Sequence, residues 1–256
     1  MDLSIEGKIR VDIINAAKKR GKIGAHIAPS LSLVEIVSAI LANYNEGDTI
    51  VLSKGHGALG LYAAMHQYGI INDEQFETFE ENGGDFPGQP SRSDDNHISY
   101  SSGSLGMGLS YAVGVAVGNR MGKVYVIIGD GELNEGSNWE AAMLAKKLNC
   151  NNLTVIVDEN GMQSDGKCSE IMDVSLKSIW GAFGWQVEET DGHDINRLIE
   201  IIEDTSEDVP RVILAHTIKG KGISFMENNN EWHHNSINDK QYDLAVTELR
   251  NTYGEQ

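Results

Sequence analysis

The apolar residues of this chain are arranged in two patterns. In the first, apolar residues recur every three or four positions, which predicts amphipathic helices. Segments with this pattern are 3–20, 31–42, 58–68, 138–148 and 194–203. In the second, apolar residues follow one another in short runs with little interruption, which is typical of strands buried on both faces. Segments with this pattern are 123–128, 153–158 and 211–217, and we expect 184–189 to be a strand as well.

From residue 123 onward the order is strand, helix, strand, and this order is then repeated. Such an alternation predicts parallel strands joined by helices that cover both faces of the sheet. We therefore expect an α/β fold with a doubly wound, mainly parallel sheet, and a single domain over residues 1–256. The residues after about 237 are expected to form a peripheral helix.

Residues 104–119 are almost all small or apolar and are expected to form a further helix. Each glycine inside a helix costs about 1 kcal/mol relative to alanine. The glycines of this segment therefore indicate that close packing matters there.

The chain is strongly acidic. Its 256 residues include 20 Lys and Arg against 38 Asp and Glu, which gives a formal net charge of −18. This charge argues against nucleic acids and anionic membranes as partners, because their phosphates attract basic surfaces. No apolar run approaches the roughly 20 residues that span a bilayer, and the first residues lack the pattern of a signal peptide. The two cysteines, Cys150 and Cys168, are too few for a disulfide framework, which favours a cytoplasmic protein.

Polar residues suited to a cation follow two of the predicted strands. Asp130 comes directly after the strand 123–128 and its closing glycine, and Asn160 follows the strand 153–158. The carboxyl ends of parallel strands meet at one edge of the sheet, where ligands bind. A carboxylate, an amide oxygen and a backbone carbonyl of the turn 160–162 would suit Mg²⁺ and leave positions open for phosphate oxygens. Gly129 and Gly131 would let the backbone approach that phosphate.

Taken singly, each of these motifs is also an ordinary turn. Other motifs are incomplete: a dinucleotide fingerprint fails at Tyr111, no P-loop is present, and no His or Cys spacing suits zinc. His66 lies in an apolar helix pattern and is expected to be structural. His193 is expected to be a turn residue.

Gly129-Asp130-Gly131 followed by Asn160 resembles the diphosphate and metal motif of thiamine diphosphate enzymes. The longer string GDGELNEGSNWEAAMLA, residues 129–145, is similar to the transketolase family in particular. Further similar motifs lie before and after this string, in the family's order: GAH at 24–26, LSKGHG at 52–57, SGSLG at 102–106, DGHD at 191–194, KGKG at 219–222 and EWH at 231–233. The resemblance implies the fold of the diphosphate-binding (PP-type) domain.

The resemblance also implies roles for individual residues. Mg²⁺ would be held by Asp130, Asn160 and the carbonyl of Met162. The residues implied in binding thiamine diphosphate are His56, Gly103, Ser104, Leu105, Gly131, Glu135, Asn160, Gln163, Lys219 and His233. Among these, His56, Gly131, Lys219 and His233 would lie at the diphosphate, Gly103 and Leu105 at the aminopyrimidine, and Gln163 near the thiazolium.

Catalytic roles are implied for His26, His56 and His233, with His26 also contacting substrate. An unperturbed imidazole has a pKa near 6.5, so His26 and His233 could exchange protons at neutral pH. Lys54 would lie beside His56 in an electropositive site that admits an anionic cofactor.

Three segments depart from the family's pattern, and one of them is Ile27-Ala28-Pro29-Ser30, which follows His26. Gln89 stands where the family usually has a substrate-binding histidine in a Gly-His-Pro segment. A glutamine can form hydrogen bonds to a sugar hydroxyl but cannot carry a proton. The chain also has Trp232-His233-His234 where the family commonly has Trp-His-Gly.

The resemblance covers only the diphosphate-binding domain. The pyrimidine-binding and C-terminal domains are expected on a separate chain of roughly 300 residues, with two copies of each chain in a heterotetramer. The implied reaction transfers a two-carbon ketol unit from a ketose to an aldose, on a sugar phosphate or nucleotide-sugar substrate. Two alternatives remain open: another thiamine diphosphate-dependent carboligase or decarboxylase, such as a deoxyxylulose phosphate synthase, and a cofactor-binding subunit without turnover of its own.

Overall fold

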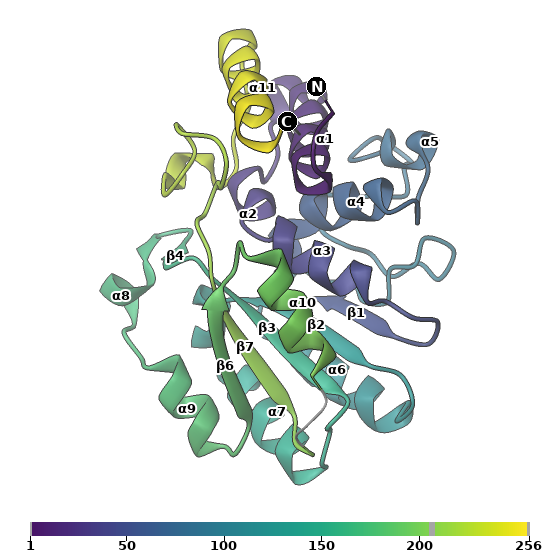
Figure 1. The fold of residues 1–256 in the computed structure, drawn as a ribbon, viewed down its shortest axis with the longest axis vertical. Coiled ribbons are helices and arrows are strands. Elements are labelled where there is room, and N and C mark those ends of the chain that lie inside the picture. Colours follow the sequence, from purple (N-terminus) through teal and green to yellow (C-terminus); the bar gives the residue numbers. More distant parts are fainter. Residues whose placement is uncertain (1, 205–207, 255–256) are drawn as a thin grey trace.

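A five-stranded parallel sheet forms the centre of the molecule, with the strand order β1-β2-β3-β7-β6 (Figure 1). The computed structural model describes residues 2–204 and 208–254. The strands of the sheet are β1 (Thr49–Leu52), β2 (Val124–Gly129), β3 (Leu153–Glu159), β6 (Gln186–Asp191) and β7 (Arg211–His216). A separate antiparallel hairpin consists of β4 (Met162–Gln163) and β5 (Gly166–Lys167).

Helices cover both faces of this sheet. The longer helices are α1 (Ile5–Lys19), α3 (Val34–Ala42), α4 (Ala58–Gln67), α6 (Gly108–Gly118), α7 (Gly136–Lys147), α9 (Leu176–Ala182), α10 (Ile195–Glu203) and α11 (Asp239–Tyr253). Single-turn helices are α2 (Ala28–Leu31), α5 (Asp73–Phe76) and α8 (Cys168–Ile171), and short 3-10 turns are η1 (Gly21–Ile23), η2 (Gly55–Gly57), η3 (Gly131–Asn134) and η4 (Asn230–Trp232).

Side chains that alternate along the strands divide the core into two layers. On β2, Tyr125 and Ile127 pack with the helices α1, α3, α4, α10 and α11, whereas Val126 and Ile128 pack with α6, α7 and α9. All six residues of β2 are buried, because each of its faces is covered by a helical layer. The predicted doubly wound, parallel α/β sheet is confirmed.

The register brings the carboxyl ends of the central strands together. Gly129 of β2 pairs with Asp158 of β3, and Glu159 of β3 pairs with His216 of β7. The residues that follow these strands, Asp130 and Asn160 among them, therefore emerge at one edge of the sheet.

The helix predicted for 104–119 begins only at Gly108. Gly103 and Gly106 have φ values of +155° and +83°, which an α-helix does not allow. The close packing expected of its glycines is present at Gly108, where an added Cβ would lie 2.3 Å from Oγ of Ser53.

Several short elements were not predicted from the pattern, among them β1 and α9. The edge strand β1 has only four residues, and α9 has only seven. The predicted helix after residue 237 is present as α11. It lies beside α1 at the periphery of the sheet (Figure 1), but it is firmly packed, because Ala245 and Leu249 belong to the core.

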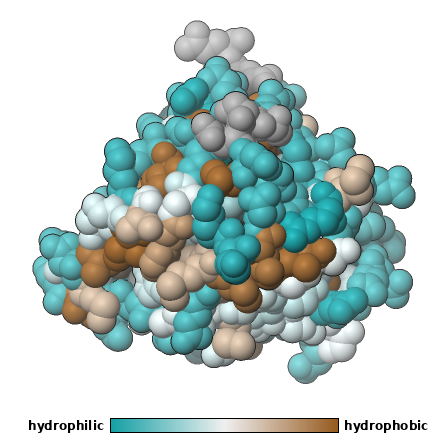
Figure 2. All heavy atoms as spheres, turned by 90° about the horizontal axis from the view of Figure 1, so that it is seen from below, coloured by the Kyte–Doolittle hydropathy of each residue, from teal (hydrophilic) through white to brown (hydrophobic). Residues whose placement is uncertain are grey.

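One helical layer leaves apolar side chains at the surface. Figure 2 views the molecule from below Figure 1 and shows a band of apolar side chains on that side. The exposed large apolar residues on α6, α7 and their flanks, here called the α6–α7 face, are Leu105, Met107, Val117, Met121, Met143, Leu144 and Leu148. Met121 is 96% exposed. Cβ atoms added at Gly114, Gly118 and Gly136 would meet no atom within 4 Å.

None of the helices in residues 2–204 and 208–254 has both the length and the apolar character that a membrane span requires.

Candidate active site

A cavity of about 120 Å³ lies at the carboxyl edge of the sheet. Its wall is built by segments that follow β1, β2, β3 and β7, together with η4 and the loop before α6. The residues predicted from the sequence that line it are His56, Leu105, Asp130, Gly131, Asn160, Met162, Gln163, Lys219 and His233. The fold therefore gathers nine predicted site residues from distant parts of the chain.

Asp130 joins the tips of β2 and β3. Its carboxylate accepts hydrogen bonds from the backbone N–H of Gly131 (2.8 Å) and of Gly161 (2.6 Å). Burial, followed by the charge of nearby Asp158, raises the pKa of Asp130 to about 6 although the two N–H donors oppose this. The carboxylate thus has no cation within the chain that fully offsets the cost of its charge.

The oxygen atoms beside Asp130 suit a hard cation. Oδ1 of Asn160 accepts from the N–H of Met162 (3.1 Å), which orders the turn that carries the Met162 carbonyl. No group of three or more His, Cys, Asp or Glu side chains in the described part of the chain could hold a metal. A cation at this cavity would therefore rely on Asp130 together with amide and backbone oxygens, a donor set typical of Mg²⁺.

Lys54 is placed differently from the sequence-based expectation. It lines the cavity, but its ammonium group forms a buried ion pair with Asp158 of β3. Burial would raise the pKa of Asp158, but the charge of Lys54 lowers it below the usual value. Asp158 also accepts hydrogen bonds from the hydroxyls of Ser32 (2.6 Å) and Thr217. Much of the Lys54 charge is therefore neutralised within the core.

Lys219 is the other buried lysine of the cavity. Its Nζ donates to the side-chain amide oxygen of Asn230 (2.9 Å). This amide is neutral, so it does not cancel the positive charge of Lys219. Burial, and then repulsion from Lys54, lowers the pKa of Lys219 to about 8. Lys219 remains mostly protonated at pH 7 and presents positive charge to the cavity.

Four histidines cluster beside this wall. The ring centroid of His26 lies 6.2 Å from that of His56, 5.4 Å from that of His233 and 4.6 Å from that of His234. Burial is the main cause that lowers the pKa of His26 and of His233 to about 4, and it places the pKa of His56 well below 6.5. The assumption of an ordinary imidazole pKa is therefore wrong for His26 and His233, and the rings of His26, His56 and His233 are neutral at pH 7.

Buried polar atoms without partners indicate where a ligand would bind. Among the described residues, Nδ1 of His233 and Nε2 of Gln163 are buried without a hydrogen-bond partner. Gly131 lies against Gln163, and a Cβ at Gly131 would be 2.7 Å from the Cβ of Gln163. Since buried polar groups are normally satisfied, this cradle fits a polar group such as a diphosphate.

The other predicted residues lie around the rim. His26 reaches the site through its ring contacts, and Gly103 and Ser104 are exposed in the loop that ends at Leu105. A Cβ at Gly103 would lie 3.2 Å from Oε1 of Gln89, so Gln89 borders this loop. Glu135 lies outside the cavity and packs against the neighbouring Gly106.

Sequence reasoning missed Glu132, which organises the cavity. Its buried carboxylate accepts hydrogen bonds from the hydroxyl of Ser53 and from the N–H groups of Gly106 (2.8 Å) and Gly129 (3.3 Å). It thus connects the ends of β1 and β2 to the loop before α6. Its position two residues after Asp130, in the string most similar to transketolases, was the available signal.

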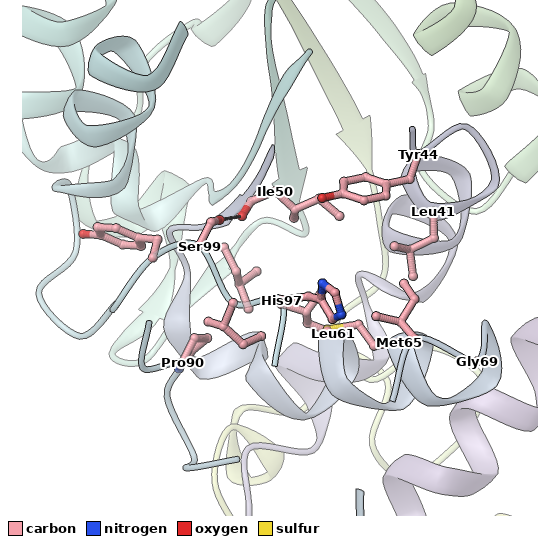
Figure 3. A pocket seen from close by; sticks show the side chains of 13 residues that line it. Leu41, Tyr44, Ile50, Leu61, Met65, Gly69, Pro90, His97 and Ser99 are labelled. Carbon is pink, nitrogen blue, oxygen red and sulfur yellow. Dashed lines mark hydrogen bonds between the residues drawn. The ribbon is translucent and has the colours of Figure 1, made fainter. Parts of the chain in front are cut away.

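A second, apolar cavity of about 330 Å³ lies beside β1 and is shown in Figure 3. Two of its polar side chains are bonded to the backbone: Tyr44 donates to the carbonyl of Asp48 (2.8 Å), and Ser99 donates to the carbonyl of Ile50. This cavity has few groups suited to chemistry, in contrast to the cavity at the sheet edge.

Comparison with known proteins gives the class of the chain. A family model described as the transketolase, thiamine diphosphate binding domain matches residues 36–256. An apulose-4-phosphate transketolase subunit from Actinobacillus succinogenes is 36% identical over 243 residues, covering 89% of this chain and 88% of that protein. The 6-deoxy-6-sulfo-D-fructose transketolase subunit SqwG of a Clostridium species is 37% identical over 247 residues, covering 90% of each.

Solved structures of complete transketolases have the same fold. The transketolase of Campylobacter jejuni superposes with a TM-score of 0.83 at 23% identity, covering 97% of this chain and 43% of that chain. The transketolase of Leishmania mexicana gives a TM-score of 0.79 at 22% identity, covering 98% of this chain and 45% of that chain. The chain belongs to the transketolase family, and it spans less than half the length of these complete enzymes.

Proposed function

We propose that this chain is the N-terminal, diphosphate-binding subunit of a two-subunit transketolase, which transfers a two-carbon ketol unit from a ketose to an aldose. The observation that carries the proposal is the convergence of Asp130, Asn160, Lys219 and the histidine cluster on one cavity. The relatives named as separate transketolase subunits, which match this chain over about nine-tenths of their length, support a division of the enzyme into two chains.

Thiamine diphosphate would be held at its diphosphate end. Asp130, the Asn160 side chain and the Met162 carbonyl would bind Mg²⁺, and Lys219, His56, Gly131 and Gln163 would contact the diphosphate or the adjoining ring. When bound, this cofactor supplies the electron sink that allows a carbon–carbon bond beside a ketone to break. The chain's own residues bind and orient it.

The neutral histidines would transfer protons and form hydrogen bonds to sugar hydroxyls. A neutral imidazole has one donor and one acceptor nitrogen, and the buried Nδ1 of His233 has no partner within the described residues. His26 and His233 would therefore bind hydroxyl groups of the substrate and pass protons between them. Their low pKa values keep both rings neutral at pH 7, so that each ring has one donor and one acceptor nitrogen available.

The partner subunit would cover the α6–α7 face. Leu105 belongs both to this face and to the wall of the cavity, so a chain that completes the site continues onto the face. Large apolar patches exposed together are typical of protein interfaces. The outward-facing Gly114 and Gly118 of α6 would let a partner helix approach closely.

Several finer features belong to the same proposal. Residues 1–256 would act as one domain, and the pyrimidine-binding and C-terminal domains would lie on the partner, in an assembly of two copies of each chain. The substrate would be a phosphorylated or nucleotide-linked sugar. Cys150 and Cys168 are unpaired, which supports a reducing compartment such as the cytoplasm.

The test mixes this chain with a candidate partner that carries a pyrimidine-binding domain. Ketol transfer between a ketose phosphate and an aldose phosphate is followed by mass spectrometry, with Mg²⁺ and thiamine diphosphate present. We expect transfer only when both chains are present. Release of CO₂ from pyruvate by the mixture, or cofactor binding without any turnover, would instead support one of the two alternatives.

A further inference from the structure

Lys219 reaches the cavity on a tight turn, residues 218–221. The N–H of Lys221 donates to the carbonyl of Ile218 (3.1 Å) and closes this turn. Gly220 has a φ of +82°, and a Cβ there would lie 2.4 Å from the carbonyl oxygen of Met226. The turn is therefore closely packed, and small changes at its ends would move Lys219.

His193 holds the first end of the turn. Its Nε2 accepts a hydrogen bond from the N–H of Ile218 (2.9 Å), and its Nδ1 lies 2.9 Å from the carboxylate of Glu35. Because Nε2 accepts, the ring proton lies on Nδ1 and is donated to Glu35. Both ring nitrogens are thus occupied. His193 lies in the turn expected from the sequence, between β6 and α10, and its ring also connects this turn to Ile218 and Glu35.

Arg10 holds the second end. Its Nε donates to the carbonyl of Lys221 (3.2 Å), and its Nη2 forms an ion pair with Glu35 (2.8 Å). Arg10 is fully buried, and its guanidinium lies 4.7 Å from the ring centroid of Tyr253. Glu35 is therefore the common anion that connects the groups at both ends of the turn.

Three elements of one helical layer supply this network. Arg10 comes from α1, Glu35 from α3 and His193 from the residues just before α10, and these helices share one core layer (Figure 1). None of the three residues is among the described residues that line the cavity. A buried charged network that touches a cavity-lining turn at both ends, but not the cavity itself, is suited to positioning.

We infer that Arg10, Glu35 and His193 form a positioning clamp on the turn 218–221, which holds the Lys219 ammonium group at the wall of the cavity for an anionic ligand. The identity of that ligand as a diphosphate rests on the proposed function. The hydrogen bond from Lys219 to Asn230 fixes the end of the side chain, whereas the clamp fixes the backbone from which the side chain extends.

Three variants of His193 separate the two contacts of its ring. His193→Gln can place an amide oxygen near the position of Nε2 and keep the acceptor for Ile218. His193→Asn can keep a donor to Glu35 only, and His193→Ala keeps neither contact. In calorimetry with thiamine diphosphate and Mg²⁺, we expect His193→Ala and His193→Asn to weaken binding about tenfold, and His193→Gln to restore most of the affinity.

A double variant tests whether His193 acts through Lys219. If it does, His193→Ala combined with Lys219→Ala binds no more weakly than Lys219→Ala alone, because the two changes remove the same interaction. Additive losses, unchanged affinity in His193→Ala, or equal affinities for the Asn and Gln variants would overturn the clamp.

A second readout does not depend on the ligand. In the chain alone, we expect His193→Ala to accelerate hydrogen exchange at the amide of Ile218 at least about tenfold, because this amide loses its acceptor. The matched control is His66→Ala, since His66 is also bonded to carboxylates but its partners lie on α1 and α5. Should the complex of the wild-type chain with its partner bind no thiamine diphosphate, the proposed function fails while the exchange result still decides the clamp. Unchanged exchange at Ile218 would refute it.

Discussion

Histidines in two regions of the molecule have opposite surroundings. His66 on α4 lies between Asp12 (2.8 Å) and Asp73 (2.7 Å) and stacks on Phe76. Burial tends to lower its pKa, but the two carboxylates outweigh burial and raise it. At the cavity no carboxylate of the described residues opposes burial, which is the main cause that lowers the pKa of His26 and of His233 to about 4; His234 adds to the effect at His26, and Lys219 at His233.

The difference shows that a polar group of the scaffold, such as His66, has its partners within the chain, whereas several polar groups at the cavity lack a full set among the described residues. Around His66, both ring nitrogens are paired with carboxylates of the chain. At the cavity, Asp130 has a raised pKa, His233 has a nitrogen without a described partner, and Lys219 donates to a neutral amide. Groups that the protein leaves incompletely satisfied are the ones a ligand can stabilise.

Asp130→Asn is expected to have the largest effect. It removes the anionic ligand proposed for Mg²⁺, so thiamine diphosphate binding should weaken at least about 100-fold in calorimetry. The raised pKa of Asp130, about 6, means that ionising this group costs more in the folded chain than in the unfolded one. We therefore expect the melting temperature at pH 7 to stay the same or rise. Unchanged affinity together with a lower melting temperature would identify Asp130 as part of the scaffold.

His26→Ala comes next in size. In the assembled complex, we expect turnover to fall about 100-fold, the usual cost of losing a proton-transfer group, while cofactor affinity stays nearly unchanged. Steady-state rates and calorimetry on the same preparation measure the two effects. His234→Ala is the matched control, because the His234 ring contacts that of His26 but no catalytic or binding role is proposed for His234. Full turnover in His26→Ala would contradict the role.

The third prediction concerns stability against pH. The pKa values of His26 and His233 are about 4 when folded and about 6.5 when unfolded. The unfolded chain therefore binds more protons in this range, and the free energy of unfolding should fall as the pH drops from about 6.5 to about 4. Urea titrations would be made in an Asp130→Asn background, since Asp130 acts in the opposite direction. Replacing His26 and His233 by Asn should flatten the profile, and an unchanged slope would contradict the assignment.

The smallest effect is expected for His66→Ala. Its raised pKa means that its contribution to stability is present below about pH 6.5 and is lost as the pH rises through the folded value. Near pH 6 we expect a loss of about 1 kcal/mol, with a smaller loss at pH 9 and cofactor affinity unchanged. A larger loss at pH 9 than at pH 6 would show that the carboxylates do not hold a charged ring.

The sequence predicted the parts of the molecule that depend on local patterns. The runs 123–128 and 153–158 had to be buried strands, and the βαβ order placed Asp130 and Asn160 at one edge. The family motifs identified His56, Gln163 and Lys219 as residues of the same cavity. The roles of these three residues came from the resemblance to the family, whereas the order of strands and helices placed only Asp130 and Asn160.

Other features depend on partners that are distant in the chain. The pairing of Lys54 with Asp158, the hydrogen bond from Ser53 to Glu132 and the connection from Glu35 to His193 join residues between 79 and 158 positions apart. The low pKa of the cavity histidines is a property of burial, which a motif does not report. The late start of α6 required the backbone angles of Gly103 and Gly106.

The ion pair of Lys54 with Asp158 has a consequence for folding. If the segment after β1 moved away alone, Asp158 would remain charged in the core without its counterion, which typically costs about 3–5 kcal/mol. This part of the wall and the central strand β3 therefore open and close as one cooperative unit. Ligands can therefore exchange at the rim of the cavity while the buried wall formed by Lys54 and β3 stays folded.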